Sequence, residues 1–266
     1  MFHKALYFKT LKDHARGIIG WMFGVVFFIT IQLAVYPTIR ASSEDWSTLT
    51  ESFPDAIKKV LRMTDYSSEI GYLSAELLSF LLPFIFIGLG CTWGARLATE
   101  DEESGAADIL LSLPITRASV LITRSTAAVT AQLLTSVVLT LSLGIGARLL
   151  GMSIAINKFI SAAVVLFLLS FVMMSLACLF GTVSGRRTVA LGVSMSVAIF
   201  AFIFYSLAPL VTALESALPY NPMQWTIGTD PLRSGVDLGY SIWLIIFSIV
   251  FLVSSLQFFN RRDIST

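Results

Sequence analysis

The sequence predicts an all-α integral membrane protein with six transmembrane helices and both termini in the cytoplasm. Of its 266 residues, 56% are hydrophobic and only 13% are charged, whereas about 25% of the residues of a soluble domain are charged. Most of the chain therefore needs no water-facing surface. The net charge of +1 favours neither nucleic acid nor an acidic ligand as a partner.

Six charge-free runs supply the predicted spans, because each approaches or exceeds the roughly 20 apolar residues that cross a bilayer. None is long enough to hide two spans and a loop. The runs cover residues 17–39, 77–95, 125–147, 159–185, 188–214 and 238–260.

The distribution of Lys and Arg predicts which side of the membrane each connection occupies. With the N-terminus in the cytoplasm, the inner segments hold eleven of these residues and the outer segments hold seven. The bias is strongest at the tails, where Arg261 and Arg262 directly follow the last span. An even number of spans then places both termini inside.

The N-terminal segment, residues 1–16, is predicted to be an interfacial helix rather than a secretory signal. It mixes apolar side chains with Lys4, Lys9, Lys12 and Arg16, and basic amphipathic helices commonly lie on a membrane surface. It has no small-residue cleavage site. We expect its two histidines to be solvated.

Two outer segments complete the topology. Residues 40–76 form an extracellular loop whose middle, 47–63, has the apolar stripe of a surface helix, either a cap on the membrane or a docking site. Residues 214–237 are apolar but broken by Pro219, Pro222 and Pro231, which indicates short re-entrant helices. An aromatic belt at the membrane interface is the simpler account of their Trp and Tyr.

The cytoplasmic insert at 99–117, TEDEESGAADILLSLPITR, is the most informative polar stretch. Its acidic cluster, 100–103, is expected in the first turn of a short helix, where it complements the helix dipole. Gly105 permits a break or a close backbone approach, and Pro114 ends the helix near Leu113. An apolar patch between them can pack on a partner or on the bundle itself.

This insert resembles the cytoplasmic loop of type-2 ABC transporter permeases. Residues 102–117, EESGAADILLSLPITR, are similar to that family's E-x-G-T-x-x-x-L-L-S-x-P-x-S-R pattern between the second and third spans, with Ala106 in place of the usual Thr. The chain end FFNRRDI (258–264) resembles the family's F-x-R-R-D ending, and DPLR (230–233) is also similar. The resemblance covers nearly the full chain.

The resemblance implies a permease subunit whose coupling helix docks on a separate ATP-binding subunit. Two six-span subunits, identical or similar, would pair, and ATP with Mg would act in the ATPase partner. The chain itself contains no G-x-x-x-x-G-K-[ST] loop, so it is not expected to be an enzyme or to bind a cofactor. The implied location is the inner membrane of a prokaryote, and the implied substrates are amphipathic drugs, antibiotics, peptides or lipid-like molecules that are exported.

The candidate site residues fall into three groups. Those expected to contact the ATPase are Glu100, Glu102, Glu103, Gly105, Asp108, Leu110, Leu113 and Pro114. In the family the second and fifth spans line the cavity, and here they carry the aromatic candidates Phe80, Phe84, Phe86, Phe200 and Phe204, although such rings more often face lipid or neighbouring helices. Gly20 and Gly24 form a small-xxx-small pair for helix packing or dimer contact.

Three further observations limit other functions. Cys91 and Cys178 lie in apolar runs, with no disulfide or metal-ligand spacing. No charged side chain is expected deep in a span, which disfavours an ion-driven carrier, and Gln32 and Gln132 are expected to bond helices together. The principal alternative is a membrane scaffold or sensor that docks a soluble partner without moving a solute.

Overall fold

The structure, a computed structural model, describes residues 3–42, 53, 58, 65, 66, 68–103 and 116–261; for 101–103, 212 and 261 it describes the backbone alone. All regular elements in this part of the chain are helices. The predicted surface helix at 47–63 lies outside the described residues except for Phe53 and Lys58.

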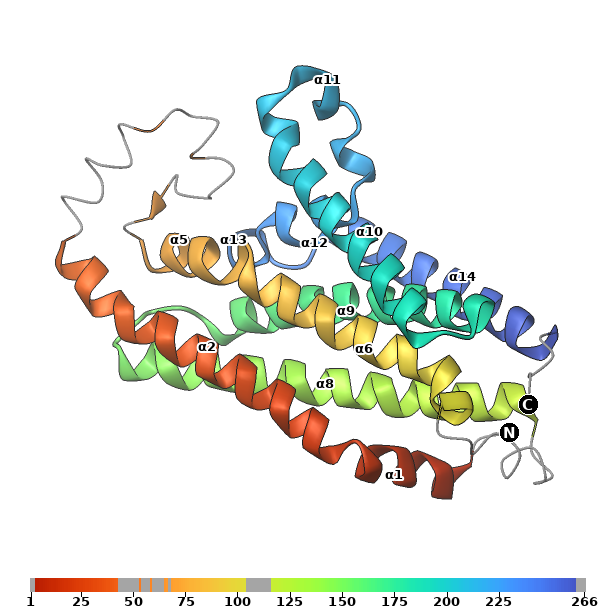
Figure 1. Ribbon diagram of the computed structural model, residues 1–266. Coiled ribbons are helices and arrows are strands. Elements are labelled where there is room, and N and C mark those ends of the chain that lie inside the picture. The colour runs from red at the N-terminus through yellow and green to blue at the C-terminus, as the bar shows by residue number, and fades with distance from the viewer. Residues whose placement is uncertain are drawn as a thin grey trace.

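Six helices are long and apolar enough to cross a membrane within the described residues. The fold is therefore that of an all-α integral membrane protein, as predicted. The six are α2 (Ala15–Ala41), α6 (Leu81–Glu103), α8 (Arg117–Leu149), α9 (Ile156–Ser184), α10 (Arg187–Leu207) and α14 (Leu238–Arg261). Helix α1 and the C-terminal end of α14 lie on the same side of the bundle (Figure 1), as an even number of spans requires.

The short helices have separate places in this arrangement. On the N-terminal side, α1 (Lys4–Asp13) precedes α2, and α5 (Glu69–Leu73) continues through the π-helix η2 (Ser74–Leu78) towards α6. The second set lies between α10 and α14, where prolines interrupt the chain. It consists of η3 (Ala208–Leu210), α11 (Thr212–Glu215), η4 (Leu218–Tyr220), α12 (Pro222–Thr226), η5 (Ile227–Thr229) and α13 (Pro231–Ser234).

Helices α6 and α9 form the centre of the bundle. In the most apolar 18-residue stretch of each of these two helices, 72% is buried, whereas the corresponding share in α2, α10 and α14 is 17%. Glycine permits their close contact, because a Cβ built on Gly90 would overlap the carbonyl oxygen of Ser170, and one on Gly94 would overlap that of Met174. Small residues bring helix backbones together in membranes, where no hydrophobic force drives helices against one another.

Helix bounds differ from the sequence prediction at two spans. The acidic cluster 100–103 forms the last turn of α6 rather than the first turn of a separate helix. No Gly or Pro lies between Ala95 and Glu103, so nothing breaks the helix as it leaves the apolar run. The fifth span is shorter than predicted, because α10 ends at Leu207 before a 3₁₀ turn that contains Pro209.

The aromatic belt stays a prediction, and Trp225 is buried against the bundle. Its ring is 8% exposed and stacks with Tyr240 and Phe247 of α14 at centroid distances of 6.4 and 5.6 Å. The indole Nε1–H donates to the carbonyl of Pro219. The segment between α10 and α14 is therefore packed against the bundle through this side chain.

We predict that Gly90→Ala destabilises the bundle, because the added methyl group must force α6 away from α9. Overpacking of this kind costs about 1–3 kcal/mol. The melting temperature in detergent measures the effect, and Gly192→Ala is the matched control, because no described atom lies within 4 Å of a Cβ built there. Equal melting temperatures for the two variants would contradict the proposed close contact.

Candidate functional site

The two helix ends on either side of the insert lie at the end of the bundle that is predicted to face the cytoplasm. Helix α6 ends at Glu103 and α8 begins at Arg117, while α1 lies along the same end of α8 (Figure 1). Thr116 caps α8 by accepting from the Ser119 N–H at 3.3 Å, which is the usual role of Thr at this position. The insert therefore leaves and re-enters the bundle beside the N-terminal helix.

Of the predicted ATPase contacts, Glu100 alone has a described side chain. Glu102 and Glu103 contribute backbone to the last turn of α6. The remaining predicted contacts lie outside the described residues, namely Gly105, Asp108, Leu110, Leu113 and Pro114.

Glu100 is bound within the chain by His14, which lies between α1 and α2. The His14 Nε2 is 2.8 Å from Glu100 Oε1, and its Nδ1 is 2.9 Å from the carbonyl oxygen of Thr10. The His14 side chain is 11% exposed, and its ring lies 5.1 Å from that of Trp93. The expectation that His14 is solvated is therefore wrong, because the fold brings a carboxylate 86 residues away to its ring.

The pKa of His14 is raised above its ordinary value, first by the hydrogen bond to Glu100. The Thr10 carbonyl and the charge of Glu100 act in the same direction, whereas burial and the charge of Arg96 oppose them. Hydrogen bonds and opposite charges favour the protonated imidazole, and desolvation disfavours it. The cationic form is thus favoured at this junction.

Helix α1 presents two different faces. Towards α8, the Tyr7 hydroxyl donates to Thr130 Oγ1 at 3.0 Å, and the backbone N–H of His3 donates to Thr123 Oγ1 at 3.3 Å. Away from the bundle, Phe8 is 65% exposed, and three lysines of this helix are exposed as well. An apolar side chain among basic ones suits the headgroup region of a membrane.

Two of the predicted aromatic residues pack together in a cluster, and the other three lie apart from it. Phe80, Phe84 and Phe202 lie edge to face or tilted, with ring centroids 4.8–5.5 Å apart. This cluster joins the start of α6 to α10 through Phe202. Phe200 is 72% exposed, Phe204 is half-buried, and Phe86 is fully buried within the bundle.

The glycine pair on α2, Gly20 and Gly24, is not covered by another described helix of the chain. No described atom lies within 4 Å of a Cβ built on Gly20 or Gly24. In contrast, Gly90 and Gly94 are covered by α9. The first pair therefore makes no close helix contact in the described single chain.

The two intramembrane glutamines each join two elements, as predicted. Gln132 of α8 donates to the sulfur of Met174 on α9 at 3.1 Å, and Gln32 of α2 donates to Glu76 Oε2 at 2.7 Å. The second contact leaves the expectation that no charged side chain lies deep in a span as it stands, because Glu76 belongs to η2 and the second span begins at Leu81. Gln32 is about 14 Å below the outer end of α2, taking a rise of about 1.5 Å per residue, and Glu76 reaches this level.

Sequence analysis did not single out Glu76, because Glu76 lies just before the charge-free run that begins at residue 77, whereas the helical structure already begins at Glu69. Glu76 lies in the π-helix η2, and π-helices are often found at functional sites. Its other carboxylate oxygen accepts from the Tyr66 hydroxyl at 2.6 Å. Two hydrogen bonds thus compensate the carboxylate for its lost hydration.

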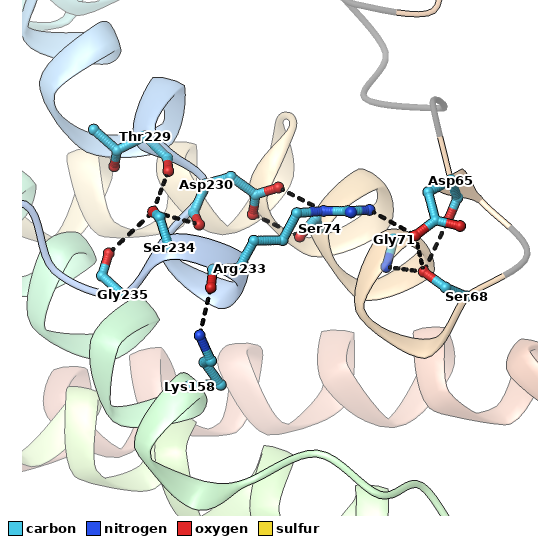
Figure 2. A network of polar contacts seen from close by, with 10 residues as sticks. All are labelled: Asp65, Ser68, Gly71, Ser74, Lys158, Thr229, Asp230, Arg233, Ser234 and Gly235. Carbon is cyan, nitrogen blue, oxygen red and sulfur yellow. Dashed lines mark hydrogen bonds and ion pairs between the residues drawn. The ribbon is translucent and has the colours of Figure 1, made fainter.

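An outer polar network joins segments that are far apart in the sequence. Figure 2 shows the Arg233 side chain extending from Asp230 to the turn that contains Asp65. Its Nε lies 3.1 Å from Asp230 Oδ2, and its Nη2 lies 3.2 Å from Asp65 Oδ2. Asp230 also accepts from the Ser74 hydroxyl at 2.7 Å, while Lys158 of α9 donates to the Arg233 carbonyl. The network therefore fastens α13 to η2 and to α9.

Asp230 adopts a left-handed backbone with φ of 49°, which no other non-glycine residue in the described part of the chain does. Asp tolerates this conformation better than most residues. The DPLR run singled out this region in the sequence. However, the contacts Arg233–Asp65 and Asp230–Ser74 join residues more than 150 positions apart. The network itself therefore could not be read from local sequence.

The architecture is that of a multi-pass membrane protein with an insert between its second and third spans. Comparison with protein families finds that residues 5–264 match the ABC-2 family transporter protein. The chain belongs to this family of ABC transporter membrane components, as its resemblance predicted. A comparison with curated protein sequences found no significant match.

We predict that Asp230→Ala lowers the melting temperature more than Arg233→Ala does. Arg233 is 40% exposed and Asp65 is 45% exposed, and exposed ion pairs contribute about 0–1 kcal/mol. Asp230→Ala also puts Ala in a left-handed conformation, a cost of about 1–2 kcal/mol. Melting in detergent checks the order. A larger loss for Arg233→Ala would assign the stability of this region to the ion pairs.

Proposed function

We propose that this chain is the permease subunit of an ABC transporter that exports amphipathic molecules with ATP hydrolysed by a separate subunit. The observation that carries the proposal is that α6 ends and α8 begins at the end of the bundle where α1 lies (Figure 1), so that the insert connects these two helices there. Membership of the ABC-2 family supports the same arrangement. An ATPase that binds the insert would act directly on the end of α6.

Helix α6 is suited to carry such a movement across the membrane. It runs from Leu81 to Glu103 without interruption, and its central glycines keep it in close contact with α9. A displacement at the cytoplasmic end would therefore move the Phe80–Phe84–Phe202 cluster at the other end. ATP binding would shift the equilibrium between two states of the pathway, provided that the ATPase binds one state more tightly.

The aromatic residues at the α6–α10 contact support an apolar or amphipathic substrate. Phe80 and Phe200 are 53% and 72% exposed, so their rings are available for contact with a ligand or another chain. Binding sites for such molecules are lined mainly by hydrophobic and aromatic side chains. Drugs, antibiotics, peptides and lipid-like molecules share this chemistry.

A second permease subunit, identical or similar, would complete the transporter. The open face of α2 around Gly20 and Gly24 is the proposed contact, since small residues permit close helix approach. ATP and Mg would be held by two ATPase subunits on the cytoplasmic side. The proposed location is the inner membrane of a prokaryote.

We predict that an ATPase copurifies with the native chain in mild detergent and is lost when Glu102, Glu103 and Gly105 are all replaced by Ala. The replacements remove charge and backbone freedom from the proposed docking segment. ATP hydrolysis in the purified fraction is the measurement. Glu215→Ala is the control, because this exposed carboxylate lies on α11 at the outer side.

Two outcomes would contradict this assignment. Copurification that survives the triple replacement would place the docking surface elsewhere on the chain. A native chain that brings down no ATPase would favour the scaffold or sensor function.

We also predict that Phe80→Ala combined with Phe200→Ala reduces ATP-dependent export of the dye Hoechst 33342 severalfold in inverted vesicles. The two rings would contact an apolar substrate, and each truncation removes that contact surface. Phe258→Ala is the control, because Phe258 is also exposed, at 49%, but lies near the end of α14. Equal loss of export in both variants would remove Phe80 and Phe200 from the proposed pathway.

A further inference from the structure

The two hydrogen bonds of His14 define its protonation state. Its Nδ1 faces the carbonyl oxygen of Thr10, and its Nε2 faces a carboxylate oxygen of Glu100. A backbone carbonyl only accepts, and an ionised carboxylate only accepts as well. Both ring nitrogens must therefore donate, and this requires the imidazolium cation.

The surrounding charges are consistent with this assignment. Arg96 of α6 and Arg124 of α8 act on Glu100, and their positive charges favour its ionised form. Arg187 of α10 in turn acts on Arg96. The titratable neighbours of His14 on its own side of the junction are Lys12, Asp13 and Arg16.

One further contact favours a cation at this position. His14 is both the C-cap of α1 and the N-cap of α2, so the two helix dipoles act on its charge in opposite directions. The tilted Trp93 ring at 5.1 Å offers a cation–π contact. Removal of one ring proton would leave one of the two acceptors without its donor.

We propose that His14 and Glu100 form a proton-dependent clamp that fastens the N-terminal helix to the cytoplasmic end of α6. While His14 is protonated, α1 and the last turns of α6 are joined through its ring. When His14 loses a proton to solvent, its charge pairing with Glu100 is lost, and α1 is released from the start of the insert. In the terms of the proposed function, a rise in cytoplasmic pH loosens the segment on which the ATPase would act.

The direction of the pH effect follows from linkage. The pKa of His14 is raised from its ordinary 6.5, so the folded chain holds this proton more tightly than the unfolded chain. The stabilisation is fully present below pH 6.5 and is lost as the pH rises through the raised pKa. The loss therefore begins above pH 6.5, and His is the side chain that commonly changes charge near physiological pH.

We predict that the melting temperature of the purified chain falls by about 2–4 °C between pH 6 and pH 9 relative to His14→Gln. Gln can still donate one hydrogen bond but carries no charge that titrates. His3→Gln is the matched control, because it removes the other histidine of the same segment. It should retain the native pH profile.

Amide hydrogen exchange over residues 4–13 provides a second readout that needs no ATPase. Exchange in the native chain should increase relative to His14→Gln at each higher pH, and Glu100→Gln should remove this difference. Parallel profiles for the native chain and both variants would overturn the proposal. Because neither measurement uses ATP, failure of the clamp is distinguishable from failure of the transport assignment.

Discussion

The close contact between α6 and α9 is the constraint on which the remaining structure depends. Gly90 and Gly94 allow the two backbones to meet, and both helices are consequently the most buried of the spans. Lipid chains solvate apolar side chains as well as protein does, so packing at short distance must replace the hydrophobic effect. Every other span is placed by its contact with this central pair or with a helix beside it.

Polar groups within the bundle are arranged in pairs for a related reason. A buried carboxylate or amide without a partner would lose several kcal/mol of hydration. Glu76 is accordingly bonded to Gln32 and Tyr66, and Gln132 donates to Met174. These pairs connect α2 to η2 and α8 to α9, so they also fix which helices are neighbours.

The two faces of the membrane carry different kinds of polar contact. On the outer side, Arg233 pairs with Asp65 and Asp230 at an exposed surface, where water and salt weaken ion pairs. On the cytoplasmic side, the half-buried His14–Glu100 pair is less screened. Both networks are attached to the segment that runs from η2 through α6, so a movement of this segment would affect both.

The sequence by itself determined the number of spans, because about 20 consecutive apolar residues have few alternatives to a membrane helix. It also placed the insert between the second and third spans and, through the pattern at 102–117, indicated the family. The sequence prediction ended the second span where the charges begin, whereas α6 continues through the acidic cluster to Glu103, because charged side chains do not by themselves end a helix.

Only the tertiary structure decided the partners of His14, Glu76 and Arg233. Their contacts with Glu100, Gln32, Tyr66 and Asp65 join side chains that are 10 to 168 positions apart. Residue type alone does not specify which of many polar groups will meet. The same limit applies to the glycine pairs, since Gly20 and Gly24 read like Gly90 and Gly94 in sequence. Helix packing covers one pair and leaves the other open within the described chain, because α9 approaches α6 and no described helix approaches that face of α2.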